Sequence, residues 1–229
     1  PTRVRYFQMM TIIVARSFHP ALGDAAQTAL LDFGMIHPAS SQRHDATPED
    51  VIQKMSTLYG AKDGSLASTF KQVKPGQAWN IVAADLVFAN AESRTWGWAS
   101  PANLRFLGFW REFEPGCRFL LVYCSPEDAV ALSLQDVSAE PADTEMLLDQ
   151  WHDYHEEMIR FYSENRDKCL LVHSSYLQHP GINSFFNQYR ENFDEQAEFD
   201  ADGYSTELTI SPLRTVLSAA VTQNRRDLA

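Results

Sequence analysis

Cysteine is scarce in this sequence, with three residues in 229, at positions 117, 124 and 169. Three cysteines are too few for a disulfide framework. Each lies in or beside an apolar run, so we expect buried, reduced thiols of a cytoplasmic protein. No run approaches the ~18–20 apolar residues that span a bilayer, and the N-terminal stretch lacks the apolar region and cleavage site of a signal peptide. We therefore expect no membrane span.

Basic residues are also few, because 19 Lys and Arg stand against 30 Asp and Glu, a formal net charge of -11 at pH 7. Such a surface repels polyanions, so nucleic acid is not an expected partner. Hydrophobic residues make up 45% of the chain, which suits a single globular domain over residues 1–229. Since the chain begins at Pro1 and not at methionine, a processed start and a domain cut from a longer chain both stay open.

Glycine-rich phosphate-binding motifs are missing. The loop at 16–24 contains one glycine, Gly23, and no lysine, whereas a nucleoside triphosphate site needs G-x-x-x-x-G-K-[ST]. G-x-G-x-x-G and G-x-S-x-G do not occur either. We therefore do not expect ATP or GTP hydrolysis, a Rossmann dinucleotide site or a hydrolase nucleophile elbow.

Apolar runs of strand length predict buried strands at 10–15, 118–123 and 169–175. Helical spacing, N-cap residues and prolines predict the intervening helices, which we place at 25–33, 48–59, 77–90, 101–112, from 126 and at 143–164. The predicted N-caps are Asp24, Thr47 and Ser125, and Gly34 is the predicted end of the first helix. Strands that alternate with helices indicate an α/β fold, a three-layer parallel sheet flanked by helices.

The C-terminal part, 191–229, differs in character from the rest. Residues 191–202 (ENFDEQAEFDAD) carry six acids and no base, which is typical of a solvated surface segment. A final helix is predicted near 212–224. Within the acidic segment, Asp200 and Asp202 form a D-x-D pair of the kind that holds Mn²⁺ or Mg²⁺ in glycosyltransferases.

Four spaced stretches resemble the bacterial carbohydrate sulfotransferase family. They are VARSFHPALGDAAQTALLDFG at 14–34, Trp96–Pro101, Phe109–Leu134 and Trp151–Val172, within about residues 10–180. The resemblance implies a fold like that of P-loop-containing nucleotide hydrolases. It also implies transfer of a sulfuryl group from phosphoadenosine phosphosulfate to a carbohydrate hydroxyl, in polysaccharide biosynthesis.

The resemblance also implies a donor site. It assigns Arg16, Ser17, Gly23 and Asp24 to the phosphosulfate loop, and Ser125 and Ser133 to the 3′-phosphate of the nucleotide. These stretches depart from the family pattern. The family motif R-S-G-T-T is represented here by Pro20–Asp24, and the motif W-G-W-K-D-P-R by Trp96–Ala102. The family motif R-D-P is represented by Cys124–Pro126, and Ser133 comes one residue later than the serine that follows R-D-P in the family. The carboxylate of Asp24 would repel the donor, since like charges at ~4 Å and an effective dielectric of about 20 cost roughly 4 kcal/mol.

Candidate proton-transfer residues lie in two loops. His19 follows the first predicted strand and could act as an acid or base near neutral pH. The connector at 37–45, which includes His44 and Asp45, resembles the acceptor-binding segment of sulfotransferases and could present a base to an acceptor hydroxyl.

Three functions stay open at this point. The first is a divergent sulfotransferase. The second is a non-catalytic sulfotransferase-like domain that binds a glycan or a protein partner, and the third is a metal-dependent glycosyltransferase that uses the D-x-D pair. His152 and His155 are spaced to share a helix face beside Glu156, but no third zinc ligand with motif context is evident. We therefore expect no metal site there.

Overall fold

The computed structural model describes residues 10–15, 20–60, 70–133 and 144–177. Four parallel strands form one sheet in the order β2-β1-β3-β4. Their bounds are β1 Met10–Ala15, β2 Thr95–Ser100, β3 Arg118–Tyr123 and β4 Cys169–His173. The predicted strands at 10–15 and 118–123 are confirmed, and the predicted strand at 169–175 ends two residues early, where a short 3-10 turn, η2 (Ser174–Tyr176), begins.

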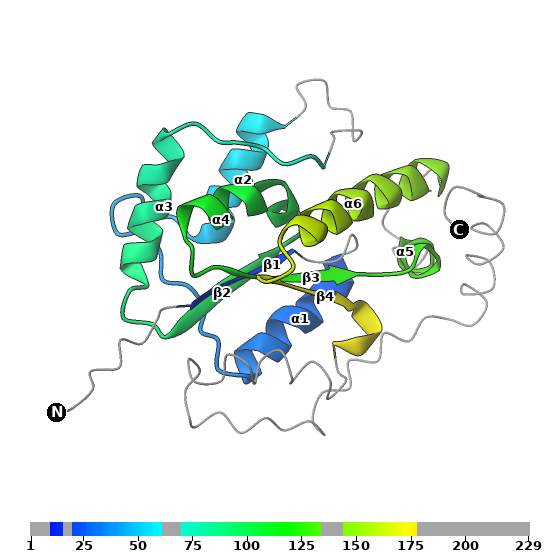
Figure 1. Cartoon of the computed structure of the whole chain (residues 1–229), viewed down its shortest axis with the longest axis horizontal. Coiled ribbons are helices and arrows are strands. Elements are labelled where there is room, and N and C mark those ends of the chain that lie inside the picture. The colour runs from blue at the N-terminus through cyan, green and yellow to red at the C-terminus, as the bar shows by residue number, and fades with distance from the viewer. Residues whose placement is uncertain (1–9, 16–19, 61–69, 134–143, 178–229) are drawn as a thin grey trace.

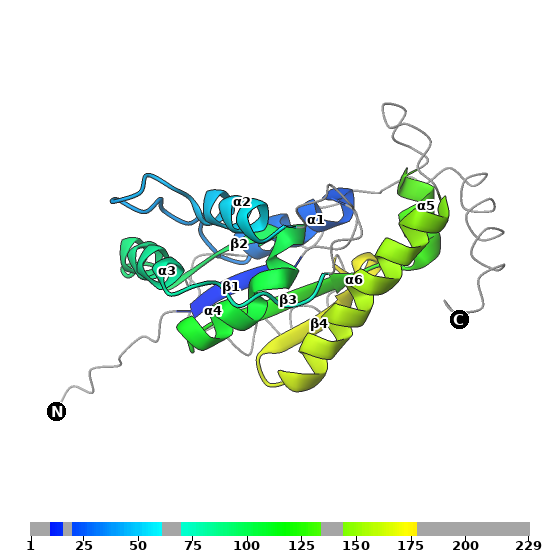
Figure 2. The same ribbon diagram turned by 90° about the horizontal axis from the view of Figure 1, so that it is seen from above.

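Helices cover both faces of the sheet, so the predicted three-layer α/β architecture is confirmed (Figure 1). One face carries α1, Pro20–Asp32. The other carries four helices, which are α2 Pro48–Tyr59, α3 Ala78–Ala89, α4 Leu107–Phe113 and α6 Thr144–Glu164. A short helix, α5 (Pro126–Ser133), lies beyond the end of β3 (Figure 2). No helix of the described residues is long and apolar enough to cross a membrane.

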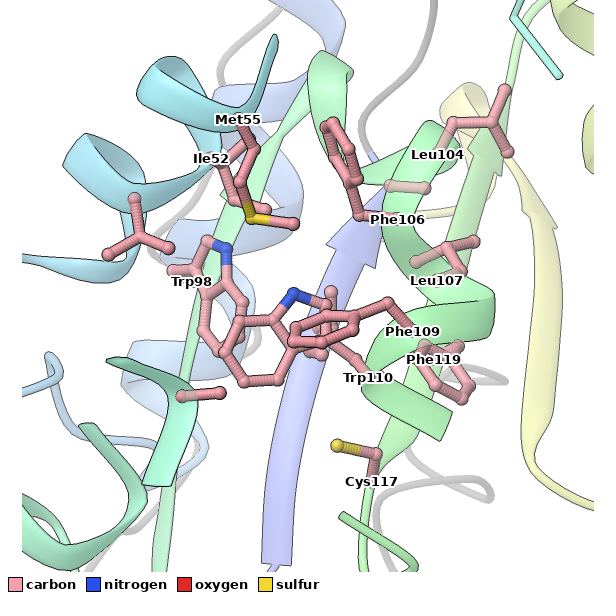
Figure 3. Close-up of a cluster of buried hydrophobic side chains, with 14 of the residues drawn as sticks. Ile52, Met55, Trp98, Leu104, Phe106, Leu107, Phe109, Trp110, Cys117 and Phe119 are labelled. Carbon is pink, nitrogen blue, oxygen red and sulfur yellow. The ribbon is translucent and has the colours of Figure 1, made fainter. Parts of the chain in front are cut away.

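The strand β2, with residues TWGWAS, is not among the strands predicted from the sequence. Trp96 and Trp98 are fully buried, and their rings stack at 5.7 Å between centroids. Trp98 also meets the edge of Trp110 from α4 at 5.0 Å. These rings belong to the larger apolar core between the sheet and the helices of the α6 face, where Figure 3 shows Ile52 and Met55 of α2 near the rings of Trp98 and Trp110. Burying aromatic rings of this size stabilises β2 enough to override its central glycine.

Capping residues set several helix boundaries. Thr47 forms the predicted N-cap of α2 as a full capping box with Asp50. Gly34 has a φ of 101°, and the amide of Met35 donates to the carbonyl of Leu30 at 2.9 Å, which is the Schellman geometry expected after α1. The prediction that Asp24 is the N-cap of this helix is wrong, because α1 already begins at Pro20, whose fixed φ suits a first helical turn.

The predicted helix at 101–112 is divided in two, a 3-10 turn η1 (Pro101–Phe106) followed by α4. The side chain of Asn103 explains how η1 is held. Its Nδ2 donates to the carbonyl of Val14 at 2.9 Å, and its Oδ1 accepts from Nε1 of Trp98 at 3.0 Å. Asn103 is fully buried, so these bonds fix η1 to the last residues of β1.

Candidate functional site

The order of the strands selects one edge of the sheet as the place for a ligand. From β1 the chain crosses to β2 on one side, and from β3 it crosses to β4 on the other. In open parallel sheets, ligands bind outside the carboxyl ends of two neighbouring strands whose connections run in opposite directions. Here those strands are β1 and β3, and α1 and α5 start near their carboxyl ends. We call this edge the switch point.

The turn between β3 and α5 is built from few residues. Ser125 is the N-cap of α5, because its Oγ accepts from the amide of Asp128 at 3.1 Å and its carbonyl accepts from the amide of Ala129 at 3.1 Å. The predicted N-cap role of Ser125 is confirmed. The first turn of α5 holds Glu127 and Asp128, which suit the positive end of the helix dipole but oppose a bound anion.

Two side chains of α6 hold the backbone of Cys124, the residue between β3 and Ser125. The indole Nε1 of Trp151 donates to the carbonyl of Cys124 at 3.1 Å, and the amide of Cys124 donates to Nε2 of His155 at 3.4 Å. Trp151 and His155 also pack ring against ring at 4.4 Å. Both polar groups of Cys124 are thus paired inside the protein, and the start of α5 is fixed to α6.

His155 is buried and neutral. Its Nδ1 lies 2.7 Å from the carbonyl of Trp151, an acceptor only, so the ring proton is on Nδ1 and Nε2 is the acceptor that Cys124 uses. The pKa of His155 is lowered from 6.5 to about 4, mainly by burial; the bond to Trp151 opposes this shift, and the nearby His152 and His173 contribute to it. The shared helix face considered for His152 and His155 does not exist, because His152 is exposed while His155 points into the core.

A polar group also lies at the carboxyl end of β4. His173, the last residue of the strand, pairs in register with Tyr123 of β3. Its Nδ1 is 2.7 Å from Oγ of Ser175, and its Nε2 is 4.0 Å from Oδ2 of Asp128. The rings of Tyr123 and Tyr176 stand nearly perpendicular to the imidazole, at 5.0 and 6.5 Å. We call Asp128, His173 and Ser175 the His173 group.

The predicted donor-site residues are only partly described. Arg16, Ser17 and His19 lie outside the described residues, and Gly23 and Asp24 lie in the first turns of α1, where the structure describes the backbone. Ser125 borders the switch point, whereas Ser133 ends α5, about 12 Å further along the helix axis. Ser125 and Ser133 are therefore not brought together. Asp200 and Asp202 also lie outside the described residues.

The segment 37–45 lies at the other end of the sheet from Ser125 (Figures 1 and 2). Just before it, Ile36 pairs with Trp96 in the amino-terminal half of β2. The amide of Ala39 then donates to Oδ1 of Asn90 at 2.7 Å, at the end of α3. The segment is thus fixed beside the amino end of β2, so the structure does not bring it to the switch point.

Within this segment the chain forms a tight turn on α3. Oγ of Ser41 donates to the carboxylate of Asp85, and the amide of Arg43 donates to the same carboxylate at 3.2 Å. The bond from Ser41 is the main cause of the lowered pKa of Asp85. His44 and Asp45 are exposed, and Asp45 has a φ of 45°, a left-handed conformation that aspartate tolerates. The roles of His44 and Asp45 in proton transfer stay predictions.

The described residues contain one cluster that could hold a metal ion, the exposed His152, Asp153 and Glu156 on α6. Such a cluster on a solvated helix face is common without an ion, and nothing else in the structure points to one there.

The sequence analysis missed the roles of His155 and His173. Leu148, Trp151, His155 and Met158 follow a 3-4-3 spacing, the pattern of a buried helix stripe, and this signal places His155 inside. His173 carries a different signal, since it is a polar residue directly after the apolar run of a parallel strand.

No family model and no curated protein matches the chain. Among solved structures, the chain is similar to the sulfotransferase domain of the olefin synthase from Synechococcus PCC 7002, with 12% sequence identity, a TM-score of 0.49, and coverage of 94% of this chain and 94% of that chain.

Proposed function

We propose that the chain is a divergent transferase of the sulfotransferase type, whose donor nucleotide, phosphoadenosine phosphosulfate, binds at the switch point. The observation that carries the proposal is the placement of the family-like stretches. The stretch at 14–34 contains the carboxyl end of β1 and α1, and the stretch at 109–134 contains β3 and α5. They thus supply both sides of the edge where a parallel sheet binds its ligand.

The acceptor in this proposal is a carbohydrate hydroxyl, and the segment with His44 and Asp45 and the loop with His19 remain the candidate sources of a base. Since His44 and Asp45 lie at the opposite end of the sheet, His19 is the one of the three whose position in the sequence, directly after β1, favours the switch point. Arg105 of η1 does not supply a free cation there, because its Nη2 donates to the carbonyl of Tyr59 at 2.8 Å.

The second candidate function is a non-catalytic domain of the same type that binds a glycan or a protein partner. A specific observation favours it, namely the carboxylates of Glu127 and Asp128 in the first turn of α5. They stand where the 3′-phosphate of the donor would approach, and their charges oppose it.

Calorimetric titration of phosphoadenosine phosphate, the product nucleotide, into the purified chain separates the two. A transferase is expected to bind it in the micromolar range, more weakly at physiological than at low salt because the contacts are ionic. A thermal shift provides a second readout, since ligand at ten times Kd stabilises the folded state by over 1 kcal/mol. The absence of heat and of a thermal shift at ~1 mM nucleotide would rule out the sulfotransferase and favour the non-catalytic domain over it.

Ser125→Asp tests the position of the nucleotide. Aspartate is as good an N-cap as serine, so we expect an unchanged thermal midpoint, while the added charge next to the phosphate lowers the affinity for phosphoadenosine phosphate at least tenfold. Gln53→Glu is the matched control, because it adds the same charge at an exposed position of α2. Equal affinity in the Ser125 and Gln53 variants would show that the nucleotide does not bind at the start of α5.

A further inference from the structure

The three side chains of the His173 group are arranged in space as in a proton relay. Ser175 Oγ lies 2.7 Å from Nδ1 of His173, and on the other side of the ring Nε2 lies 4.0 Å from a carboxylate oxygen of Asp128. A hydroxyl, an imidazole and a carboxylate that follow one another in space in this order activate a serine in hydrolases of unrelated folds. The three residues come from η2, β4 and α5, which meet at the carboxyl ends of β3 and β4.

The backbone fixes which ring nitrogen is the base. The amide of Ser175 donates to Nδ1 of His173 at 3.2 Å, so Nδ1 carries a lone pair and the neutral ring holds its proton on Nε2. The hydroxyl of Ser175, the nearer donor at 2.7 Å, shares this lone pair with the amide, and the Nε2 proton faces Asp128. When Nδ1 takes up the hydroxyl proton, the bond from the Ser175 amide is given up. The two ring nitrogens are thereby assigned opposite roles, as a proton relay requires.

We propose that Asp128, His173 and Ser175 make the Ser175 hydroxyl a nucleophile toward carboxylic esters, an activity separate from the proposed sulfuryl transfer. In the first step Oγ of Ser175 bonds to the acyl carbon while its proton moves to Nδ1 of His173. The bond from the acyl carbon to the alcohol oxygen then breaks, and His173 returns the proton to that leaving oxygen. Water hydrolyses the acyl-serine by the same route, with Nδ1 taking the proton of the water and giving it back to Oγ.

Asp128 has a defined part in these steps. When His173 takes up the proton, both ring nitrogens carry hydrogen and the imidazolium stands next to the carboxylate. In this step the carboxylate stabilises the positive charge that the ring gains, and apo distances of this kind shorten when the charge forms. Asp128 is itself fixed, because its amide is bonded to the N-cap Ser125.

The surroundings indicate the class of ester. Ser175 is exposed, so a substrate can reach its hydroxyl. The rings of Tyr123 and Tyr176 both lie next to the imidazole of His173 and are 36% and 56% exposed. Exposed aromatic rings next to the nucleophile favour an aromatic group on the substrate through edge-to-face contacts. We therefore assign aryl esters as the preferred substrate class.

A local structural role is the competing explanation, because the bond from the amide of Ser175 to Nδ1 also caps η2. A cap needs only an acceptor, whereas the relay needs a base. His173→Asn separates the two roles, since the asparagine Oδ1 occupies the place of Nδ1 and accepts the same amide proton but takes up no proton at neutral pH.

The test is phosphonylation of the full chain by a fluorophosphonate, followed by mass spectrometry of its peptides. The reagent forms an Oγ–P bond with an activated serine and releases fluoride, while the proton leaves through the imidazole. We expect the adduct on Ser175, a labelling rate at least 100-fold lower in His173→Asn, and a rate about tenfold lower in Asp128→Asn. His152→Asn, on the exposed face of α6, is the matched control and keeps the wild-type rate.

Three results would overturn the proposal: no adduct, an adduct on other residues only, or a wild-type labelling rate in a folded His173→Asn variant. Should that variant lose its cooperative unfolding, Ser175→Ala takes its place, because it keeps the amide that bonds to Nδ1. The readout is then hydrolysis of p-nitrophenyl acetate, which we expect Ser175→Ala to reduce to the background rate. Unchanged hydrolysis in Ser175→Ala would contradict the proposal equally.

Discussion

Gly97→Ala is expected to remove the cooperative unfolding transition of the protein. Gly97 lies in the middle of β2, opposite Ile12 of β1. A Cβ at this position would overlap the carbonyl oxygen of Ile12, stand 2.9 Å from its carbonyl carbon and reach 2.8 Å from Sδ of Met35. The obstacle is mainly the backbone of a buried strand, which cannot turn away as a flexible side chain can.

The size of the effect follows from what must move. To admit one methyl group, β2 has to separate from the central strand, and the ladder between β1 and β2 is lost with the packing of Trp96 and Trp98. We expect a loss of more than about 4 kcal/mol in the free energy of unfolding, comparable to the whole stability of many domains. Urea titration followed by circular dichroism measures it.

Gly76→Ala is the matched control, because the nearest atom to its added Cβ, the hydroxyl of Tyr59, is 3.7 Å away and no left-handed φ is required. Its urea midpoint is expected to equal or exceed that of the wild type. A Gly97→Ala protein that unfolds at the wild-type midpoint would mean that β1 and β2 do not approach as closely as described.

The second large expected effect is a fall in the free energy of unfolding at acidic pH, which His155 causes. Burial holds the pKa of His155 at about 4 in the folded protein, against 6.5 for a free imidazole. Between pH 6.5 and 4 the unfolded chain therefore binds more protons at this residue than the folded one does. The free energy of unfolding falls as the pH drops through this window, by up to about 3 kcal/mol, and above pH 6.5 the residue adds no pH dependence.

The physical reason is local. Protonation would place a hydrogen on Nε2, which faces the amide of Cys124, and two donors would then point at each other inside the core. The bond that fixes the start of α5 to α6 would be lost, and with it one support of the proposed nucleotide site. Acid should therefore weaken nucleotide binding only as the pH falls to about 4, where His155 of the folded protein takes up its proton.

His155→Gln isolates this contribution, because glutamine offers an acceptor to Cys124 and does not titrate. We expect its unfolding free energy to depend less on pH between 4 and 6.5 than that of the wild type. His37→Gln, at an exposed position outside α6, should keep the wild-type pH dependence. Parallel curves for wild type and His155→Gln would contradict the assignment of a neutral, buried His155.

The fold can be predicted from the sequence where the burial of apolar side chains alone decides the local structure. The runs MTIIVA and RFLLVY contain little besides aliphatic and aromatic residues, so a buried parallel strand is the structure that hides them. β2 was missed because it is short and its central glycine weakens the local strand signal, and because its strand state depends on a ring from α4 that the local sequence does not contain.

The candidate site was less predictable than the sheet. Ser125 could be identified as an N-cap because serine followed by proline and two acids is a local pattern. The position of His44 and Asp45 could not, since it depends on bonds to Asp85 and Asn90, over 40 residues further along the chain. The same holds for His173 and Asp128, which approach each other only when β3 and β4 pair.

The pairing of the central strand also affects how the chain is made. β1 precedes both of its neighbours by a long stretch, since Ile12 pairs with Gly97 on one side and with Arg118 on the other. During synthesis at about 5–20 residues per second, β1 remains without its second partner strand, β3, for some 5–20 s. Until then its apolar residues and open hydrogen-bonding edges are exposed to other chains. Folding of this protein is thus slow to begin and sensitive to concentration, and expression at low temperature with chaperones present should raise the yield of monomeric protein.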